Sequence, residues 1–186
     1  KNHEFLIEVM KYLPDTYKLI LAGPTTTAGE VNPGIKTEQI PQLRSHIGKI
    51  GLTERIKVIP GFVDTAKYLS GADVFCFPAE NEAMGTPLLE SLASGVPVVA
   101  NADESSFREH IVDGKNGFLH PLNARQWANA IIKAANLNLE QRQQFAKETA
   151  TKYSTDKIDN NYFKLMTALL LTEAKERISV ANVLEH

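Results

Sequence analysis

The chain has 186 residues and a formal net charge of −2; 43% of its residues are hydrophobic and 23% are charged. These values are typical of an ordinary globular domain, and such evenly mixed charge gives no electrostatic support for a nucleic-acid or anionic-membrane partner. No apolar run approaches the roughly 20 residues that a transmembrane helix needs. The single cysteine, Cys76, excludes an internal disulfide and fits a reducing compartment. We interpret it as a small buried apolar residue rather than a reactive thiol.

Short apolar runs alternate with helical patterns along the chain. In chain order, we expect a helix over Glu4–Leu13, a strand over Lys18–Ala22, a loop to Gly34, and a helix that contains Ile40 and Ile47 and ends at Gly51. A strand over Ile56–Pro60, a helix over Asp64–Ser70, a strand over Val74–Phe77 and a helix over Thr86–Ser94 follow. The last elements are strands over Val96–Ala100 and Gly117–His120 and helices over Ala124–Ala135, Glu140–Tyr153 and Thr155–Leu171. This alternation predicts an α/β fold in which helices cover both faces of a parallel sheet. Ligands of such sheets bind beyond the carboxyl ends of the strands.

The loop between Phe77 and the helix at Thr86 is the most informative stretch. Thr86 suits the cap of that helix and Pro87 its first position. A helix that starts directly after a parallel strand offers free amides and the positive end of its dipole, which suits a phosphate. Gly85 lets the backbone approach a diphosphate closely. We place Glu90 in the first helical turn, where its carboxylate can accept hydrogen bonds from a ribose diol.

Acidic residues also have an ordinary explanation in this stretch. Glu80 and Glu82 can be solvated loop residues, and Glu90 can simply stabilise the helix dipole by about 0.3–1 kcal/mol. The five histidines are scattered without metal-ligand spacing, so the sequence predicts no metal site. For the acidic residues, a family resemblance favours a ligand site over the ordinary explanation.

Residues 77–100 resemble the signature of retaining glycosyltransferases with two Rossmann-like domains, the GT-B architecture. That signature is a strand ending in proline, a glutamate, seven residues, a second glutamate on a helix of small residues, and Gly-x-Pro-Val-Val. Here it comprises Pro78, Glu82, Gly85, Glu90 and residues 93–99, and the resemblance extends to Gly61-Phe62, Ala72-Asp73, Glu109 and residues 113–118. The resemblance implies a Rossmann-like three-layer αβα sandwich, the C-terminal half of a GT-B enzyme.

The resemblance also implies roles for individual residues. Glu82 would contact hydroxyls of the transferred sugar, Glu90 would bind the ribose, and Lys1 would bind the diphosphate, so that Glu82 and Lys1 are the candidate catalytic residues. The remaining candidates for donor binding are the backbone amides of Gly85, Thr86 and Leu89, the pair Ala83-Met84 where the family often has Gly-Phe, and Phe62-Val63 beside the base. No metal, no further cofactor and no covalent nucleophile is implied.

The two ends of the chain resemble one interrupted segment of the family. The family domain opens with a strand, an arginine that binds diphosphate, and a lysine before the first helix; this chain starts at that lysine, Lys1. Ile178–Val183 resembles the missing strand and puts Asn182 where the family often has arginine. Three explanations stay open: a circular permutation that makes this segment the central strand, pairing with a neighbouring copy, and chance resemblance next to a tag remnant at residues 184–186.

We therefore divide the chain into a nucleotide-sugar-binding domain over residues 1–172 and a C-terminal segment over residues 173–186. The segment is expected to supply the central strand of the same domain, between Lys18–Ala22 and Val74–Phe77. A sheet without its central strand would leave backbone groups unpaired in the core. Because chain termini of domains often lie close together, permutation is physically tolerable.

By the same resemblance, the reaction moves a hexosyl group from a nucleoside diphosphate sugar to an acceptor hydroxyl with retained configuration. The acceptor, a glycan or lipid, would be bound by an N-terminal domain outside this chain, so the chain alone is not expected to be a complete enzyme. The location implied is the cytoplasm or the inner face of the membrane. Two rival functions stay open: a nucleotide-sugar-binding module without transfer activity, and a sugar-nucleotide epimerase-like domain, which would need histidine and acidic residues converging on the sugar.

Overall fold

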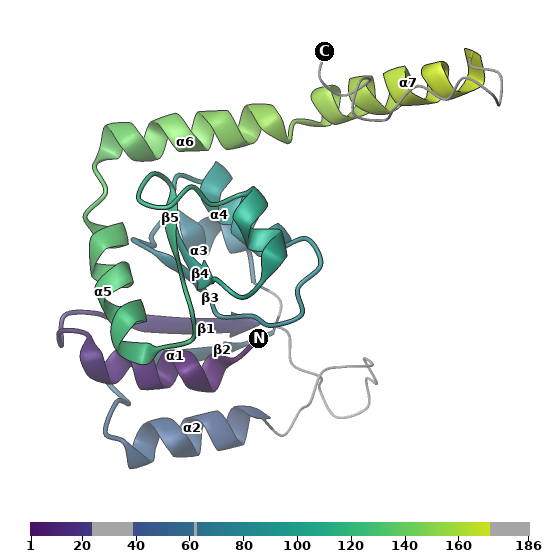
Figure 1. Cartoon of the computed structure of the whole chain (residues 1–186). Helices are drawn as coiled ribbons and strands as arrows, with labels where there is room; N and C mark the ends of the chain where they lie inside the picture. Colours follow the sequence, from purple (N-terminus) through teal and green to yellow (C-terminus); the bar gives the residue numbers. More distant parts are fainter. Residues whose placement is uncertain (24–38, 62, 172–186) are drawn as a thin grey trace.

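The computed structural model describes residues 1–23, 39–61 and 63–171 (Figure 1). Its helices are α1 (His3–Val9), α2 (Gln39–Lys49), α3 (Thr65–Leu69), α4 (Thr86–Ala93), α5 (Ala124–Ala135), α6 (Leu139–Lys152) and α7 (Thr155–Leu171), with 3₁₀ turns η1 (Met10–Tyr12) and η2 (Ser105–Glu109). Its strands are β1 (Leu19–Gly23), β2 (Ile56–Pro60), β3 (Phe75–Phe77), β4 (Val98–Asn101) and β5 (Gly117–His120). Helices and strands alternate from α1 to α5, which confirms the α/β class.

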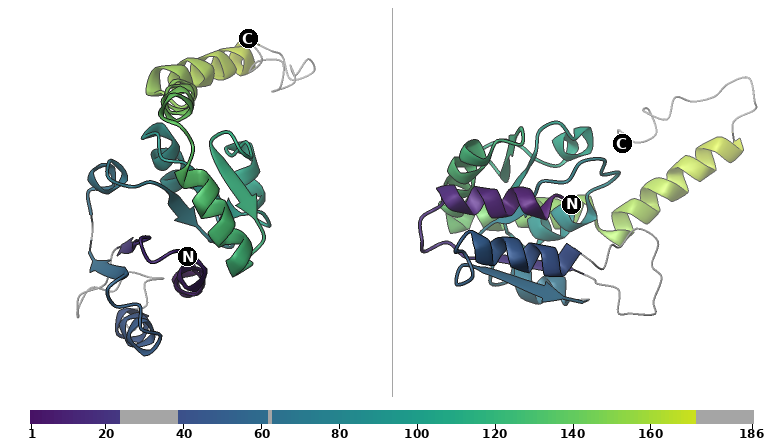
Figure 2. Two further views of the ribbon diagram at one scale, coloured as in Figure 1. Left: turned by 90° about the vertical axis from the view of Figure 1, so that its left-hand side faces the viewer. Right: turned by 90° about the horizontal axis from the view of Figure 1, so that it is seen from below.

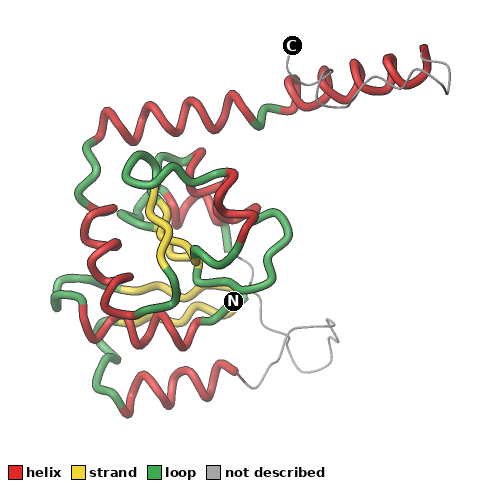
Figure 3. The backbone as a smooth tube through the Cα atoms, in the orientation of Figure 1, coloured by secondary structure: helices red, strands yellow, loops and turns green. Residues whose placement is uncertain are grey.

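Within the described residues, the strands form two parallel sheets. β1 pairs with β2, with Leu21 opposite Val58, and β3, β4 and β5 pair in that order, with Cys76 opposite Val99 and Val99 opposite Phe118 (Figure 3). Within the described ranges, β1 and β3 each have a partner on one edge only. The segment expected between them, residues 178–183, lies outside the described residues.

Most predicted boundaries agree with the structure to within two residues, and the exceptions have local causes. The first helix ends as an α-helix at Val9 and continues as the 3₁₀ turn Met10–Tyr12, because Pro14 follows closely and excludes the α conformation for the residue before it. The strand predicted from Val96 begins at Val98, after Pro97, which has no amide hydrogen to donate. The 3₁₀ turn η2 was not predicted.

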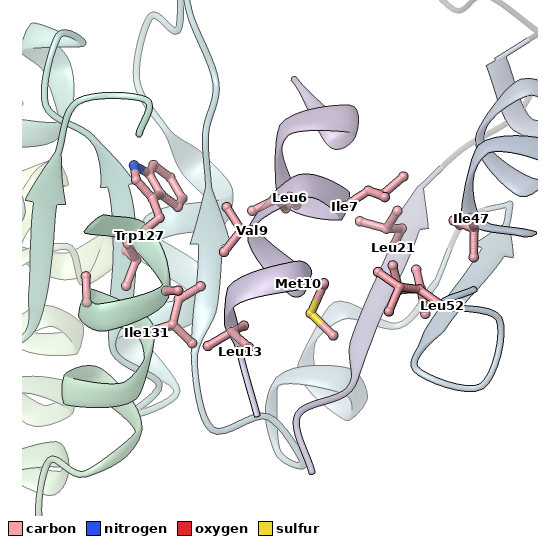
Figure 4. Packing of buried hydrophobic residues seen from close by; sticks show 14 of the residues in the cluster. Leu6, Ile7, Val9, Met10, Leu13, Leu21, Ile47, Leu52, Trp127 and Ile131 are labelled. Atoms are coloured by element: carbon pink, nitrogen blue, oxygen red, sulfur yellow. The ribbon is translucent and has the colours of Figure 1, made fainter. Parts of the chain in front are cut away.

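Helix α1 is the centre of the larger hydrophobic core. Its residues Leu6, Ile7 and Val9 are at most 5% exposed, and the surrounding cluster joins β1, β2, β3, β4, α2 and α5. Figure 4 shows α1 between Leu21 of β1 on one side and Trp127 of α5 on the other. Helix α1 therefore packs against both sheets and connects them, although no strand pairing joins them in the described part of the chain.

A second, smaller core packs the helix after β3 onto the three-stranded sheet. Leu88 and Leu92 of α4 are buried with Phe77 of β3, Phe107 of η2 and Phe145 of α6. The rings of Phe77 and Phe107 lie 5.1 Å apart between centroids. This cluster fixes the direction in which α4 leaves the end of β3.

Helix α6 packs on α4, and α7 continues from its end beyond the rest of the domain (Figures 1 and 2). Tyr162 and Phe163 of α7 are 67% and 74% exposed. None of the helices in the described ranges has the length and apolar character required to span a bilayer.

Gly117 lets β4 and β5 approach one another. A Cβ atom built on Gly117 lies 2.3 Å from the carbonyl oxygen of Val98. Because that neighbour is backbone, Gly117→Ala must push the two strands apart, and we expect a loss of roughly 3 kcal/mol or more in the free energy of unfolding, at the upper end of overpacking costs. Chemical denaturation measures this.

Gly23→Ala is the matched control, because Gly23 is also a strand glycine and a Cβ there meets no described atom within 4 Å. We expect it to change stability by no more than about 0.5 kcal/mol. Equal stability of the two variants would contradict the close approach of β4 and β5.

Candidate functional site

The site begins where β3 ends. Pro78 and Ala79 continue the strand's path into the interior, and Asn81 then takes a left-handed conformation with φ 60°. Asparagine tolerates this conformation better than most residues. The chain turns there and presents Glu82, whose side chain is only 15% exposed. An inward-turned acidic side chain at the carboxyl end of a parallel strand is where a ligand site of this fold is expected.

Helix α4 starts at a glycine rather than at a hydroxyl cap. Gly85 occupies the N-cap position with φ 70° and makes no side-chain cap, so the prediction of Thr86 as the cap is wrong; Thr86 is the first helical residue. The physical reason is that only the left-handed turn at Gly85 brings α4 back over β3, and glycine adopts it at no steric cost. As a consequence Glu90 is the fifth helical residue and does not lie in the first turn.

The amides at the start of α4 are used unequally. Leu88 and Leu89 donate hydrogen bonds to the carbonyl oxygen of Gly85 at 2.8 and 3.2 Å, so both amides are engaged within the first turn of the helix. The expectation that the Leu89 amide faces a diphosphate stays a prediction. Among the described residues, the amides of Gly85 and Thr86 donate no hydrogen bond. They are the pair that the positive end of the helix dipole presents to an anion.

Lys1 and Glu82 meet across the site. The Nζ of Lys1 donates to a carboxylate oxygen of Glu82, and the same ammonium group lies 5.3 Å from the centroid of the Phe77 ring. The side chain of Lys1 remains 56% exposed. The structure thus brings together the two residues that the sequence nominated as catalytic, one from the start of α1 and one from the loop after β3.

The other nominated residues lie along or beside the same turn. Ala83 and Met84 are exposed, Met84 to 64%. Glu90 is exposed, has no hydrogen bond or ion pair from its carboxylate within the described ranges, and follows Thr86 by four residues, so both side chains share one helix face. Val63 is half-buried in the loop after β2. Asn182 and Phe62 lie outside the described residues.

Three residues at the end of β4 and just after it support this loop and were missed in the sequence. Asn101, 2% exposed, donates to the carbonyl of Ala79, Glu104 accepts from the backbone N–H of Glu82 at 2.8 Å, and the hydroxyl of Ser106 donates to the carbonyl of Glu82 at 3.1 Å. The available signal was their position: polar residues directly after the strand that pairs with β3 share its carboxyl edge.

Neither a metal centre nor a reactive thiol stands out in the part of the chain that the structure describes. That part contains no group of three metal-ligating side chains placed to hold an ion. Cys76 is half-buried on β3, and burial raises the pKa of its thiol to about 12, which keeps it protonated at neutral pH. The interpretation of Cys76 as a packing residue fits this pKa.

Gly85 is expected to tolerate no side chain. A Cβ there lies 3.2 Å from Cε1 of Phe107, and φ 70° adds the strain of a left-handed conformation, about 1–2 kcal/mol for an L-residue. We therefore expect Gly85→Ala to cost at least about 2 kcal/mol in the free energy of unfolding, measured by denaturant titration.

Gly114→Ala separates the two causes. Gly114 has φ 75°, but a Cβ there meets no described atom within 4 Å, so only the conformational cost applies. If Gly85→Ala is no more costly than Gly114→Ala, Phe107 yields to the added methyl group and does not constrain the turn.

The sequence matches a family model described as "Glycosyl transferases group 1" over residues 1–152. The lipopolysaccharide core biosynthesis glycosyltransferase LpsE of Rhizobium meliloti (strain 1021) is 27% identical over 172 residues, which are 90% of this chain and 46% of that protein. A phosphatidyl-myo-inositol mannosyltransferase of Mycobacterium leprae (strain TN) is 41% identical over 83 residues, 43% of this chain and 21% of that protein. The chain thus spans less than half the length of these relatives.

Solved structures share the fold. HepE from Anabaena, crystallised with UDP and glucose, superposes with a TM-score of 0.74 at 21% identity over 90% of this chain and 45% of that one. The pneumococcal O-GlcNAc transferase GtfA, crystallised with UDP and GlcNAc, gives a TM-score of 0.68 at 21% identity over 92% of this chain and 34% of that one. These neighbours are GT-B glycosyltransferases, and with most of its length matched by the family model this chain belongs to the group 1 glycosyltransferases.

Proposed function

We propose that this chain is the donor-binding domain of a retaining glycosyltransferase that moves a hexosyl group from a nucleoside diphosphate sugar to an acceptor hydroxyl. The observation that carries the proposal is the juxtaposition of Lys1, Glu82 and the turn at Gly85. A cation, a carboxylate and two unused amides then lie at one end of the parallel strands, which is where a sugar diphosphate would find its complementary groups.

In this proposal each group serves one part of the donor. The amides of Gly85 and Thr86, with Lys1, bind the diphosphate and stabilise the charge that develops on it as it leaves. Glu82 binds hydroxyls of the transferred sugar, and Glu90, one turn along the exposed face of α4, binds the ribose. Val63, with Phe62, borders the base. Catalysis comes from position and charge, and no residue of the chain is assigned as a covalent nucleophile.

Relatives with sugar nucleotides support the donor class. HepE was crystallised with UDP-glucose as well as with UDP and glucose, and one relative in sequence is a mannosyltransferase. We propose that the acceptor, a glycan or lipid, is bound by a further domain of the parent protein. We place the reaction in the cytoplasm or at the inner face of the membrane, because the one cysteine of the chain is a free thiol, as in reducing compartments.

We also propose that Ile178–Val183 completes the sheet between β1 and β3 and brings Asn182 beside Lys1. Support comes from the free edges of β1 and β3 in the described part of the chain, and from α1, which packs on both sheets. In a doubly wound sheet, the strand that leads into the first helix lies between the second and fourth strands. Lys1 marks the point at which such a strand would end.

Donor binding is tested by a thermal-shift screen of UDP-glucose and GDP-mannose on the chain. At about 100 times the dissociation constant, a true ligand adds about 2.7 kcal/mol of stability. We expect Glu82→Ala and Glu90→Ala to weaken the best ligand by at least about tenfold, since hydrogen bonds to charged groups contribute about 1.5–3 kcal/mol. Glu80→Ala is the control: Glu80 is an exposed acidic residue of the same loop.

Three outcomes would count against the proposal. If no sugar nucleotide shifts the melting temperature, the chain is not a donor domain. If Glu80→Ala weakens binding as much as Glu82→Ala, only the overall charge of the loop matters. Donor binding together with no donor-dependent transfer by the full-length parent would favour the non-catalytic module.

The proposed strand is tested by hydrogen exchange. We expect deletion of residues 173–186 to increase exchange at the amides of β1 and β3, because these strands then lose the proposed pairing with residues 178–183, and to leave β5 unchanged. Light scattering of the intact chain then distinguishes a strand from the same molecule, which leaves a monomer, from one supplied by a neighbouring copy. Unprotected amides over residues 178–183 would reject the proposal.

A further inference from the structure

The backbone of Glu82 is held entirely by side chains from one segment after β4. Its N–H donates to Oε2 of Glu104 at 2.8 Å, and its carbonyl accepts from the hydroxyl of Ser106 at 3.1 Å. The same hydroxyl lies 3.4 Å from Oε1 of Glu104. Both backbone polar groups of Glu82 are therefore fixed by two side chains of the same segment, which we call the Glu104–Ser106 clamp.

The clamp acts where the loop has no regular secondary structure of its own. Residues 78–85 belong to neither β3 nor α4, and Asn81 is left-handed. Without side-chain partners, the N–H and carbonyl of Glu82 would bond to water, and the loop could sample other conformations at little cost. The clamp removes that freedom at the residue whose carboxylate points to Lys1.

The charge of Glu104 suits this task. Hydrogen bonds, first from the backbone N–H of Glu82 and then from Ser106, lower the pKa of the Glu104 carboxyl. The group is therefore ionised at neutral pH, and an ionised carboxylate is a stronger acceptor for a backbone amide than a neutral oxygen. Its contribution to the folded state is present above the ordinary pKa of 4.5 and lost as the pH falls through the lowered value.

The anchor of the clamp is rigid. Phe107, next to Ser106, is fully buried, and its ring packs against Gly85 and lies 5.1 Å from the ring of Phe77. Asn101, at the end of β4, donates to Ala79 at the start of the loop. The segment after β4 thus contacts the loop at its start, middle and end, and a site supported in this way holds its geometry better than a free loop.

We propose that Glu104 and Ser106 are positioning residues that fix the backbone of Glu82, so that its carboxylate meets the sugar of the donor. This inference rests on the proposed function and adds a specific consequence. The clamp should matter for the sugar of the donor and not for its nucleoside diphosphate, because Gly85 is the N-cap and Thr86 the first residue of α4, and Glu104 accepts from the amide of Glu82 and not from theirs.

The test compares two ligands on each variant of the intact chain. Isothermal titration gives the dissociation constants of UDP and UDP-glucose, and of GDP and GDP-mannose. For each pair, the dissociation constant of the diphosphate divided by that of its sugar nucleotide measures what the sugar contributes to binding. We expect Glu104→Ala to reduce this ratio on the order of tenfold, since small displacements in a positioned site are costly, and to leave the constant for the free diphosphate within about twofold. Ser106→Ala should act in the same direction and more weakly, because it removes a neutral hydrogen bond.

Two further variants serve as controls: one is a conservative replacement of Glu104 and the other a change at a neighbouring residue. Glu104→Gln keeps an oxygen that can accept from the Glu82 amide, so it should recover most of the ratio. Asp103→Ala removes an exposed acidic side chain one residue away and should change nothing. Hydrogen exchange supplies an independent readout: the Glu82 amide should exchange faster in Glu104→Ala, with α4 unchanged.

The outcomes separate the two proposals. If the unmodified chain binds none of the four ligands, the proposed function fails and the clamp has no sugar to serve. If the chain prefers the sugar nucleotide and Glu104→Ala keeps that preference, only the clamp is rejected. If Glu104→Ala loses the same affinity for the nucleoside diphosphate as for the sugar nucleotide, the clamp is also rejected, because that result means general damage to the fold.

Discussion

The left-handed turn at Gly85 constrains everything around it. The chain must leave β3, enter α4 and bury Leu88 and Leu92 on the sheet, and it does so with φ 70° at a residue packed directly on Phe107. A helix that reversed direction more gradually would need a longer loop and would move its free amides away from the strand end. The same turn therefore sets both the packing of α4 and the position of its free N-terminal amides, the proposed diphosphate site.

Parallel pairing explains why distant segments converge on that turn. β3 and β4 end at the same edge, so residues at or after the end of either strand meet there: Glu82 follows β3, Asn101 ends β4 and Glu104 follows β4. Lys1 reaches the same edge because α1 runs back along the sheets before β1 begins (Figure 1). No single stretch of sequence contains the site, and the strand register assembles it.

Local patterns predicted the elements and the chemical groups, but not the contacts between segments. The alternation of apolar runs located the five strands of the described ranges, and the Pro78 to Glu90 stretch located the candidate site. The assignment of Thr86 as cap failed because composition favours a hydroxyl there, while the tertiary path over β3 requires a glycine. Glu104 could not be assigned, because its role depends on the spatial pairing of β3 with β4. That β1 and β3 each have one partner among the described strands likewise follows from pairing across the sheet and not from any local signal.

The Lys1–Glu82 ion pair is best understood as a consequence of the fold and not as a cause. The Lys1 side chain is more than half exposed, and an ion pair with such a partner contributes about 0–1 kcal/mol. By contrast, burying each of Leu6, Ile7 and Val9 contributes roughly 1.5–3 kcal/mol. The core, through α1, therefore decides where Lys1 stands, and the loop decides where Glu82 stands. Because breaking the pair costs little, the proposed donor could bind the ammonium group through its diphosphate and the carboxylate through a sugar hydroxyl without disturbing the structure that holds both residues.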